Sequence, residues 1–205
     1  MRGLAEKGHD VTVLNTFGEK NPPKNGSYRD IILTSEMTQD GVGKVDFKIV
    51  TLNDDNEWLS NLVAYDLFQI VDQNFVIYNL FMNWMGNTVT EITLGHPEVQ
   101  KLLNSGEKFD VVIMEQFVND GLKVLAHQFQ APLVLFSTCG SNAWINPLVG
   151  NPAPPSYVPE QNIVFHSSNF FDRLRNSIIY TYGYINRHLM FFPAQNKIVK
   201  KYFPD

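Results

Sequence analysis

Two apolar, strand-like segments separated by a short helical one place the strongest constraint on the fold of this chain. The first, FDVVIMEQF at residues 109–117, holds a continuous apolar run, which is typical of a strand buried on both faces. Asp120–Phe129 has a helical pattern, and Ala131–Ser137 is a second apolar run. Consecutive strand–helix–strand steps favour parallel pairing with right-handed crossovers. The sequence therefore predicts an α/β fold built on a Rossmann-like, doubly wound parallel sheet.

Further elements are expected on both sides of this unit. A short helix that ends at Gly8 precedes a buried strand at Val11–Leu14, because glycine readily adopts the left-handed conformation that ends a helix. Apolar residues recur at helical spacing from Asn56 to about Thr93. The other expected elements are a strand around Phe47–Leu52, a short helix within His96–Asp110 and an amphipathic helix at Asn169–Phe192.

A proline-rich segment, PLVGNPAPPSYVP, occupies residues 147–159 and contains five prolines. Proline fixes its own φ angle, removes a backbone donor and restricts the preceding residue. Such a segment is therefore unsuited to a helix or an interior strand. We expect a structured surface loop that can border a pocket.

Composition excludes several classes of function. The chain has 205 residues, 44% of them hydrophobic, which is enough for one domain with a buried core. Its net charge of −5 argues against binding nucleic acid through phosphate contacts. The single cysteine, Cys139, excludes an internal disulfide and a cysteine-based zinc site. No two histidines have metal-ligand spacing, so no metal is expected. Polar residues interrupt the most apolar window, Leu67–Met85, and neither a membrane span nor a signal sequence is predicted.

Taken together, five segments resemble the amino-terminal half of the family 1 UDP-glycosyltransferases of animals, particularly of insects. They are LAEKGHDVTVL, FDVVIMEQF, APLVLFSTCG, the proline-rich segment and FFDRLRN. The resemblance implies that residues 1–205 form the acceptor-binding domain of a GT-B glycosyltransferase, without the donor-binding domain. It also implies that the first strand of the sheet precedes Met1. We therefore expect a fragment or a truncated gene model that is poorly stable by itself.

The chemistry implied by the resemblance is inverting transfer of a sugar from a UDP-sugar to a small lipophilic acceptor. A histidine acts as general base on the acceptor, and a carboxylate orients this histidine. The family's histidine follows the missing first strand, and none of the five histidines here matches it. His9 is expected to be a turn residue. The UDP-sugar is a co-substrate bound mainly by the absent half, so no cofactor is expected.

Two residues are alternative candidates for the orienting carboxylate. Glu115 aligns with the family's strand-end aspartate, but its side chain is one methylene longer. Asp120 begins the next helix, where it could instead cap that helix. The expected acceptor-lining residues follow the strand ends, and each has loop packing as its alternative role. They are Phe117, Ser137, Asn142 and Trp144.

By resemblance, the intact protein is a detoxifying transferase on the lumenal side of the endoplasmic reticulum membrane, attached through segments absent from this chain. Its expected partners are a lipophilic acceptor and a UDP-sugar. The sequence is also compatible with a homo-oligomer. The alternative hypothesis is a truncated acceptor-binding or partner subunit without catalysis. The sequence does not identify the acceptor, the sugar or the oligomeric state.

Overall fold

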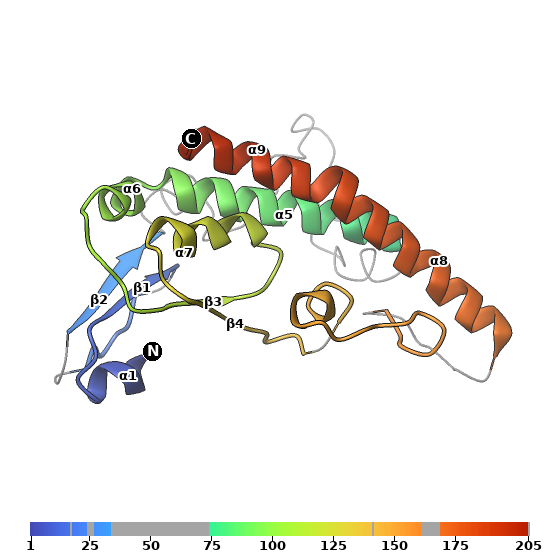
Figure 1. The fold of residues 1–205 in the computed structure, drawn as a ribbon, viewed down its shortest axis with the longest axis horizontal. Helices are drawn as coiled ribbons and strands as arrows, with labels where there is room; N and C mark the ends of the chain where they lie inside the picture. Colours follow the sequence, from blue (N-terminus) through green and yellow to red (C-terminus); the bar gives the residue numbers. More distant parts are fainter. Residues whose placement is uncertain (17, 24–26, 34–73, 141, 161–168, 205) are drawn as a thin grey trace, which may run out of the picture. The chain divides into compact units, whose positions relative to one another are not determined.

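The computed structural model describes residues 1–16, 18–23, 27–33, 74–140, 142–160 and 169–204 (Figure 1). The chain divides into two compact units, which we describe separately. The first unit comprises Met1–Tyr65 and Gly95–Leu102, and the second comprises Asp66–Leu94 and Leu103–Asp205. The strand expected around Phe47–Leu52, and the helix expected from Asn56 as far as residue 73, lie outside the described residues.

Two parallel strands form the centre of the first unit. Helix α1 (Arg2–Glu6) is followed by Gly8 at a φ of +92°, which confirms the expected glycine stop. Strand β1 (Val11–Asn15) pairs in parallel with β2 (Tyr28–Ile32). The sequence does not predict β2, because Arg29 and Asp30 interrupt its apolar pattern.

Side-chain contacts explain how those polar residues fit a strand. Asp30 accepts hydrogen bonds from the side chains of Asn15 (3.0 Å) and Tyr28 (3.1 Å). The Arg29 guanidinium donates to the Thr12 hydroxyl on β1 at 3.1 Å. Helix α6 (Pro97–Leu103) belongs almost entirely to this unit, and its first residue, proline, suits a helix start.

The predicted strand–helix–strand unit is confirmed in the second unit. Strand β3 (Val112–Glu115) pairs in parallel with β4 (Leu133–Phe136), with Val112 opposite Leu133 and Glu115 opposite Phe136. The 3₁₀-helix η2 (Asp120–Lys123) and helix α7 (Val124–Gln128) connect the two strands. Within the described ranges each sheet has two strands. The fold is thus mixed α/β with small parallel sheets, and this part of the chain does not include a complete doubly wound sheet.

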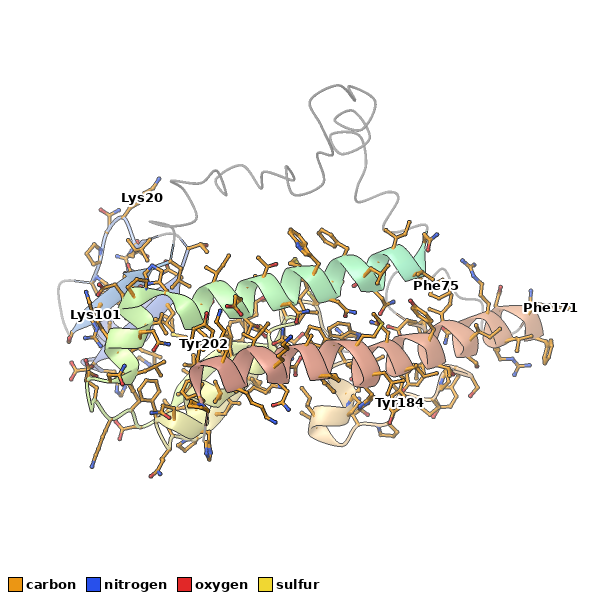
Figure 2. The ribbon with its side chains drawn as sticks, turned by 90° about the horizontal axis from the view of Figure 1, so that it is seen from above. Lys20, Phe75, Lys101, Phe171, Tyr184 and Tyr202 are labelled. Atoms are coloured by element: carbon orange, nitrogen blue, oxygen red, sulfur yellow. The ribbon has the colours of Figure 1, made fainter. Side chains whose placement is uncertain are left out.

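A long helical pair forms the rest of the second unit. Helix α5 (Phe75–Gly95) lies alongside α8 (Phe170–Asn186), the π-helical segment η4 (Arg187–Phe191) and α9 (Phe192–Tyr202), as both views show (Figures 1 and 2). The sequence predicts that this last helix ends at Phe192, and that prediction is wrong. Pro193 lies in the first turn of α9. A proline crowds the carbonyl of an earlier turn, and the wider π-helical turn before it allows the helix to continue.

Polar side chains, five of them buried and five of them amides, join these helices in what we call the amide seam. Its members are Asn79, Asn83, Asn87, Thr90, Asn186 and Gln195. Asn186 exchanges hydrogen bonds with Asn83 (3.0 and 3.2 Å) and donates to Asn79 (3.3 Å). Gln195 accepts from the Thr90 hydroxyl at 2.9 Å and donates to Asn87 at 2.8 Å. Because a buried polar group without a partner is destabilising, these pairs fix the register of the two helices.

An apolar cluster lies beside the amide seam. Met82, Val118 and Phe191 are buried together, and Trp144 packs against them. Gly86 provides the space for this contact, because a Cβ at that position would lie 2.1 Å from the Val118 carbonyl oxygen and 2.9 Å from the Phe191 ring. The turn after β3 and helix α5 therefore meet closely only because residue 86 is glycine.

We expect Gly86→Ala to destabilise the chain by about 1–3 kcal/mol, because the added methyl group forces the Val118 turn away from α5. Urea unfolding followed by circular dichroism measures this loss. Gly183→Ala is the matched control, since its Cβ would lie 3.9 Å from the nearest atom, the Asn79 Oδ1. This control should be neutral or stabilising by up to about 1 kcal/mol. Equal stability of Gly86→Ala and the unchanged chain would contradict the packing described here.

Candidate functional site

The carboxyl ends of β3 and β4 lie side by side and carry the candidate carboxylate Glu115. Glu115 is exposed at the last position of β3, opposite Phe136 of β4. The Thr138 hydroxyl, two residues beyond β4, donates a hydrogen bond to Glu115 Oε1. This contact restricts the rotamers of the Glu115 carboxylate. Sequence reasoning did not single out Thr138, because nothing in its local pattern indicates this contact.

The turn that follows Glu115 has a strained backbone. Val118 adopts a φ of +46°, which is rare for a β-branched residue. The Asn119 side chain accepts from the Phe117 N–H at 3.1 Å and donates to the Glu115 carbonyl at 2.9 Å. Burial of Val118 against α5 adds to this restraint. Strained residues gather at functional sites in proteins, and this one lies between the two candidate carboxylates.

Asp120, the second candidate, takes part in local structure. Its Oδ1 accepts from Gln116 Nε2 at 3.3 Å and forms an ion pair with Lys123. The residue lies in the first turn of η2, and Asn119 occupies the N-cap position in its place. The neighbouring Gly121 N–H donates to Gln195 Oε1 of α9 at 2.8 Å. Asp120 is thus held by two side chains in a turn that is fastened to the helical pair.

A buried cation lies close to this turn. Arg187 of η4 is 6% exposed, donates through Nη1 to the Ala143 carbonyl at 3.1 Å and lies 5.6 Å from the centre of the Trp144 ring. Burial lowers the pKa of the Arg187 guanidinium, while the carboxylates of Asp120 and Glu160 act in the opposite direction. The sequence shows an arginine among aromatic residues here but not its burial.

The four expected acceptor-lining residues differ in their surroundings. Phe117 is exposed just beyond β3. The Ser137 hydroxyl donates to the Gly140 carbonyl at 2.9 Å, and Asn142 Oδ1 accepts from the backbone N–H groups of Trp144 (2.9 Å) and Ile145 (3.1 Å). Trp144 also packs on Phe191, with 5.6 Å between the ring centres. Phe117 is therefore the most open of the four, while the other three stabilise the loop after β4.

The proline-rich segment is an ordered loop in its described part. It begins with the 3₁₀-helix η3 (Asn146–Val149) and turns at Gly150, where φ is +67°. The fully buried side chain of Asn176, on α8, donates to the carbonyls of Pro155 and Val158, both at 2.7 Å. It also accepts from the Glu160 N–H at 2.8 Å. One asparagine thus fastens the loop to α8, where the missing proline donors leave few backbone partners.

The described residues contain no cluster of three or more histidine, cysteine, aspartate or glutamate side chains that could hold a metal ion. Within the same ranges, no helix combines the length and the apolar character needed to cross a bilayer. His9 is exposed in the turn after α1, where its backbone N–H donates to the Leu4 carbonyl at 3.2 Å.

Comparison with known proteins identifies relatives along almost the whole chain. UDP-glucosyltransferase 2 of Dactylopius coccus is 26% identical over 213 residues, which cover 99% of this chain and 35% of the relative. The 2-hydroxyacylsphingosine 1-beta-galactosyltransferase of Homo sapiens is 26% identical over 202 residues, which cover 97% of this chain and 31% of the relative. UDP-glycosyltransferase UGT5 of Dactylopius coccus is 30% identical over 107 residues, 51% of this chain and 20% of the relative.

The chain thus spans about a third of the length of the first two of these relatives. No protein-family model and no solved structure matches it. The relatives are sugar transferases by name, and two of them match at least 97% of the chain. The resemblance to the UDP-glycosyltransferases is therefore confirmed at the level of the family, and the chain is a low-identity relative of these proteins.

Proposed function

We propose that this chain is the acceptor-binding domain of a GT-B UDP-glycosyltransferase that transfers a sugar from a UDP-sugar to a small lipophilic acceptor. The observation that carries the proposal is the match to two sugar transferases over 99% and 97% of the chain. The parallel pairing of β3 and β4 supports it, since α/β proteins bind their ligands at the carboxyl ends of such strands. No observation favours the alternative of a non-catalytic subunit.

Glu115 is the carboxylate that we assign to orienting the base histidine. Thr138 holds its Oε1, while Oε2 has no hydrogen-bond partner among the described residues. An exposed carboxylate restrained through one oxygen can accept an imidazole N–H with the other. Such a contact selects the histidine tautomer and stabilises the imidazolium that forms when the base takes the acceptor's proton. The longer side chain of glutamate is compatible with this role because Thr138 limits its rotamers.

Asp120 is less suited to that role. Its contacts with Gln116 and Lys123 engage the carboxylate within the turn itself. Both contacts use Oδ1, but the Asp120 side chain is only 16% exposed and is already paired with a cation, whereas Glu115 is exposed and has no cationic partner among the described residues. We assign Asp120 to holding the turn after β3, so that Glu115 and Phe117 face the end of the sheet.

Phe117 is the residue that we place against the acceptor, since it is the most open of the expected lining residues. An apolar ring at this point suits a lipophilic acceptor. Ser137, Asn142 and Trp144 then shape the site through the loop that they stabilise. By the same resemblance, we place the intact protein at the endoplasmic reticulum, in detoxification.

The function is tested by sugar transfer in a protein of full family length. UDP-glucosyltransferase 2 of Dactylopius coccus, with this chain in place of its matched segment, is incubated with labelled UDP-sugars and a panel of phenolic acceptors. We expect a glycosylated phenol, because the inserted chain supplies the acceptor site. Binding of UDP-sugar and the unfolding temperature serve as controls for folding. A folded, UDP-binding protein that yields no product with any acceptor would contradict the proposal.

The substitutions Glu115→Gln and Asp120→Asn, made one at a time in the same protein, show which of the two carboxylates orients the histidine. We expect Glu115→Gln to lower kcat by roughly 10²–10⁴-fold at unchanged stability, because an amide cannot stabilise the imidazolium. Asp120→Asn should mainly lower stability, by about 0.5–1 kcal/mol, because it removes the negative charge that pairs with Lys123. Turnover and urea unfolding measure these effects. The reverse pattern, with kcat lost only in the stable Asp120→Asn protein, would assign the role to Asp120.

A further inference from the structure

One side chain of α9, that of Gln195, bonds both to α5 and to the segment that follows β3. It is 2% exposed. Its Oε1 accepts from the Thr90 hydroxyl (2.9 Å) and from the Gly121 N–H of η2 (2.8 Å), and its Nε2 donates to Asn87 of α5 (2.8 Å). A carbonyl oxygen can accept two donors in this way. Because each buried polar group left without a partner costs about 1–3 kcal/mol, Gln195 is restrained relative to both segments.

The turn after β3 is held against the helical pair at two points. Gly121 is the first, since a Cβ there would lie 2.6 Å from Gln195 Oε1 and 2.8 Å from Thr90 Cγ2, so the backbone of η2 lies directly on both side chains. Val118 is the second, because it is buried against α5 at Gly86. Its φ of +46° is unfavourable for valine and persists only where the surrounding contacts impose it. The turn therefore takes its conformation from α5 and α9 as well as from its own sequence.

Asn119 connects these two points with the end of β3. Its side chain donates to the Glu115 carbonyl at 2.9 Å and accepts from the Phe117 N–H at 3.1 Å. Its own carbonyl accepts from the Leu122 N–H of η2 at 2.9 Å. A displacement of Gly121 would therefore reach the backbone of Glu115 through hydrogen-bonded neighbours.

We propose that Gln195 is a positioning residue for the Glu115 carboxylate. Its bond to the Gly121 N–H fixes the turn after β3, and this turn sets the direction in which the Glu115 side chain leaves the end of the strand. The inference rests on the role proposed above for Glu115. Gln195 itself takes no part in the chemistry and needs no contact with the acceptor. The effect is measurable because a misplacement of about 1 Å at a reacting group can lower the rate by roughly 10²-fold.

Sugar transfer by the protein of full family length described above tests this inference. Gln195→Met keeps most of the side-chain volume and removes the acceptor of the Gly121 N–H. We expect kcat to fall by roughly 10–100-fold, while the KM for the UDP-sugar stays unchanged. Gln195→Glu keeps an oxygen acceptor for the Gly121 N–H and should restore most of kcat. A role in stability alone would not give this recovery, because burying a carboxyl group costs at least as much stability as burying a thioether.

Thr90→Val is the matched control within the same network. Valine has the shape of threonine, so this variant loses only the hydroxyl that donates to Gln195 and leaves the bond to Gly121 in place. We expect it to lose about 0.5–1.5 kcal/mol of stability and to keep its kcat. Gly121→Ala disturbs the same contact from the side of the turn, because its methyl group would crowd Gln195 Oε1, and it should lower kcat as Gln195→Met does. All rates are measured at a temperature at which circular dichroism shows each variant to be folded.

A second readout, on the chain itself, does not depend on activity. The backbone amide resonance of Phe117 in NMR spectra reports the turn beside Glu115, and it should shift in Gln195→Met and stay in place in Thr90→Val. The inference is overturned if the folded Gln195→Met protein keeps its kcat or its Phe117 resonance, and Gly121→Ala decides by the same criteria if Gln195→Met does not fold. A shifted Phe117 resonance in a protein that transfers no sugar even when unchanged would contradict the proposed function and not the link between Gln195 and the turn.

Discussion

The side chain of Gln195 connects three segments that are far apart in the sequence. It is 2% exposed, and it bonds the Thr90 hydroxyl and the Asn87 amide of α5 as well as the Gly121 N–H of η2. All three contacts lie inside the unit, where an unpaired polar group costs about 1–3 kcal/mol. A glutamine of α9 therefore fixes both the register of the helical pair and the position of the turn after β3. The Gln195 side chain can approach the backbone at position 121 this closely because that residue is glycine. A Cβ added to Gly121 would lie 2.6 Å from Gln195 Oε1.

The candidate site depends on this arrangement. The turn after β3 has an unfavourable φ at Val118, which is retained because Val118 is buried against α5 and because Asn119 bridges both sides of the turn. The same turn follows directly on Glu115. A change in the helical pair would therefore move the candidate carboxylate without any substitution at the end of the sheet. This dependence explains how residues far from the site can influence its geometry.

Local patterns account for the parts of the fold that the sequence predicts. Continuous apolar runs identify β3 and β4, and the helical connection between them indicates parallel pairing, as observed. Strand β2 escapes prediction because its charged residues are satisfied by partners on β1. The extension of the last helix through α9 depends on a π-helical turn that no propensity indicates.

For the candidate site, the sequence likewise predicts which residues to consider but not the contacts that surround them. The family resemblance identifies Glu115 at the strand end and Asp120 at the start of the next helix as alternatives, and the roles of both remain predictions. The contact of Glu115 with Thr138 joins residues 23 positions apart, and the bond between Thr90 and Gln195 joins residues 105 apart. Contacts of this kind have no local signature in a single sequence, so only the folded chain distinguishes the surroundings of the two carboxylates.

Amide hydrogen exchange at Gly121 tests most directly whether Gln195 fixes the turn. The bond from the Gly121 N–H to Gln195 predicts that this amide exchanges as slowly as the interior of α5, although it belongs to a connecting segment. The exposed Gly140, after β4, provides the fast reference. Gln195→Met should release Gly121 selectively, because methionine preserves most of the side-chain volume without the acceptor. An unchanged chain in which Gly121 exchanges as fast as Gly140 would contradict this account.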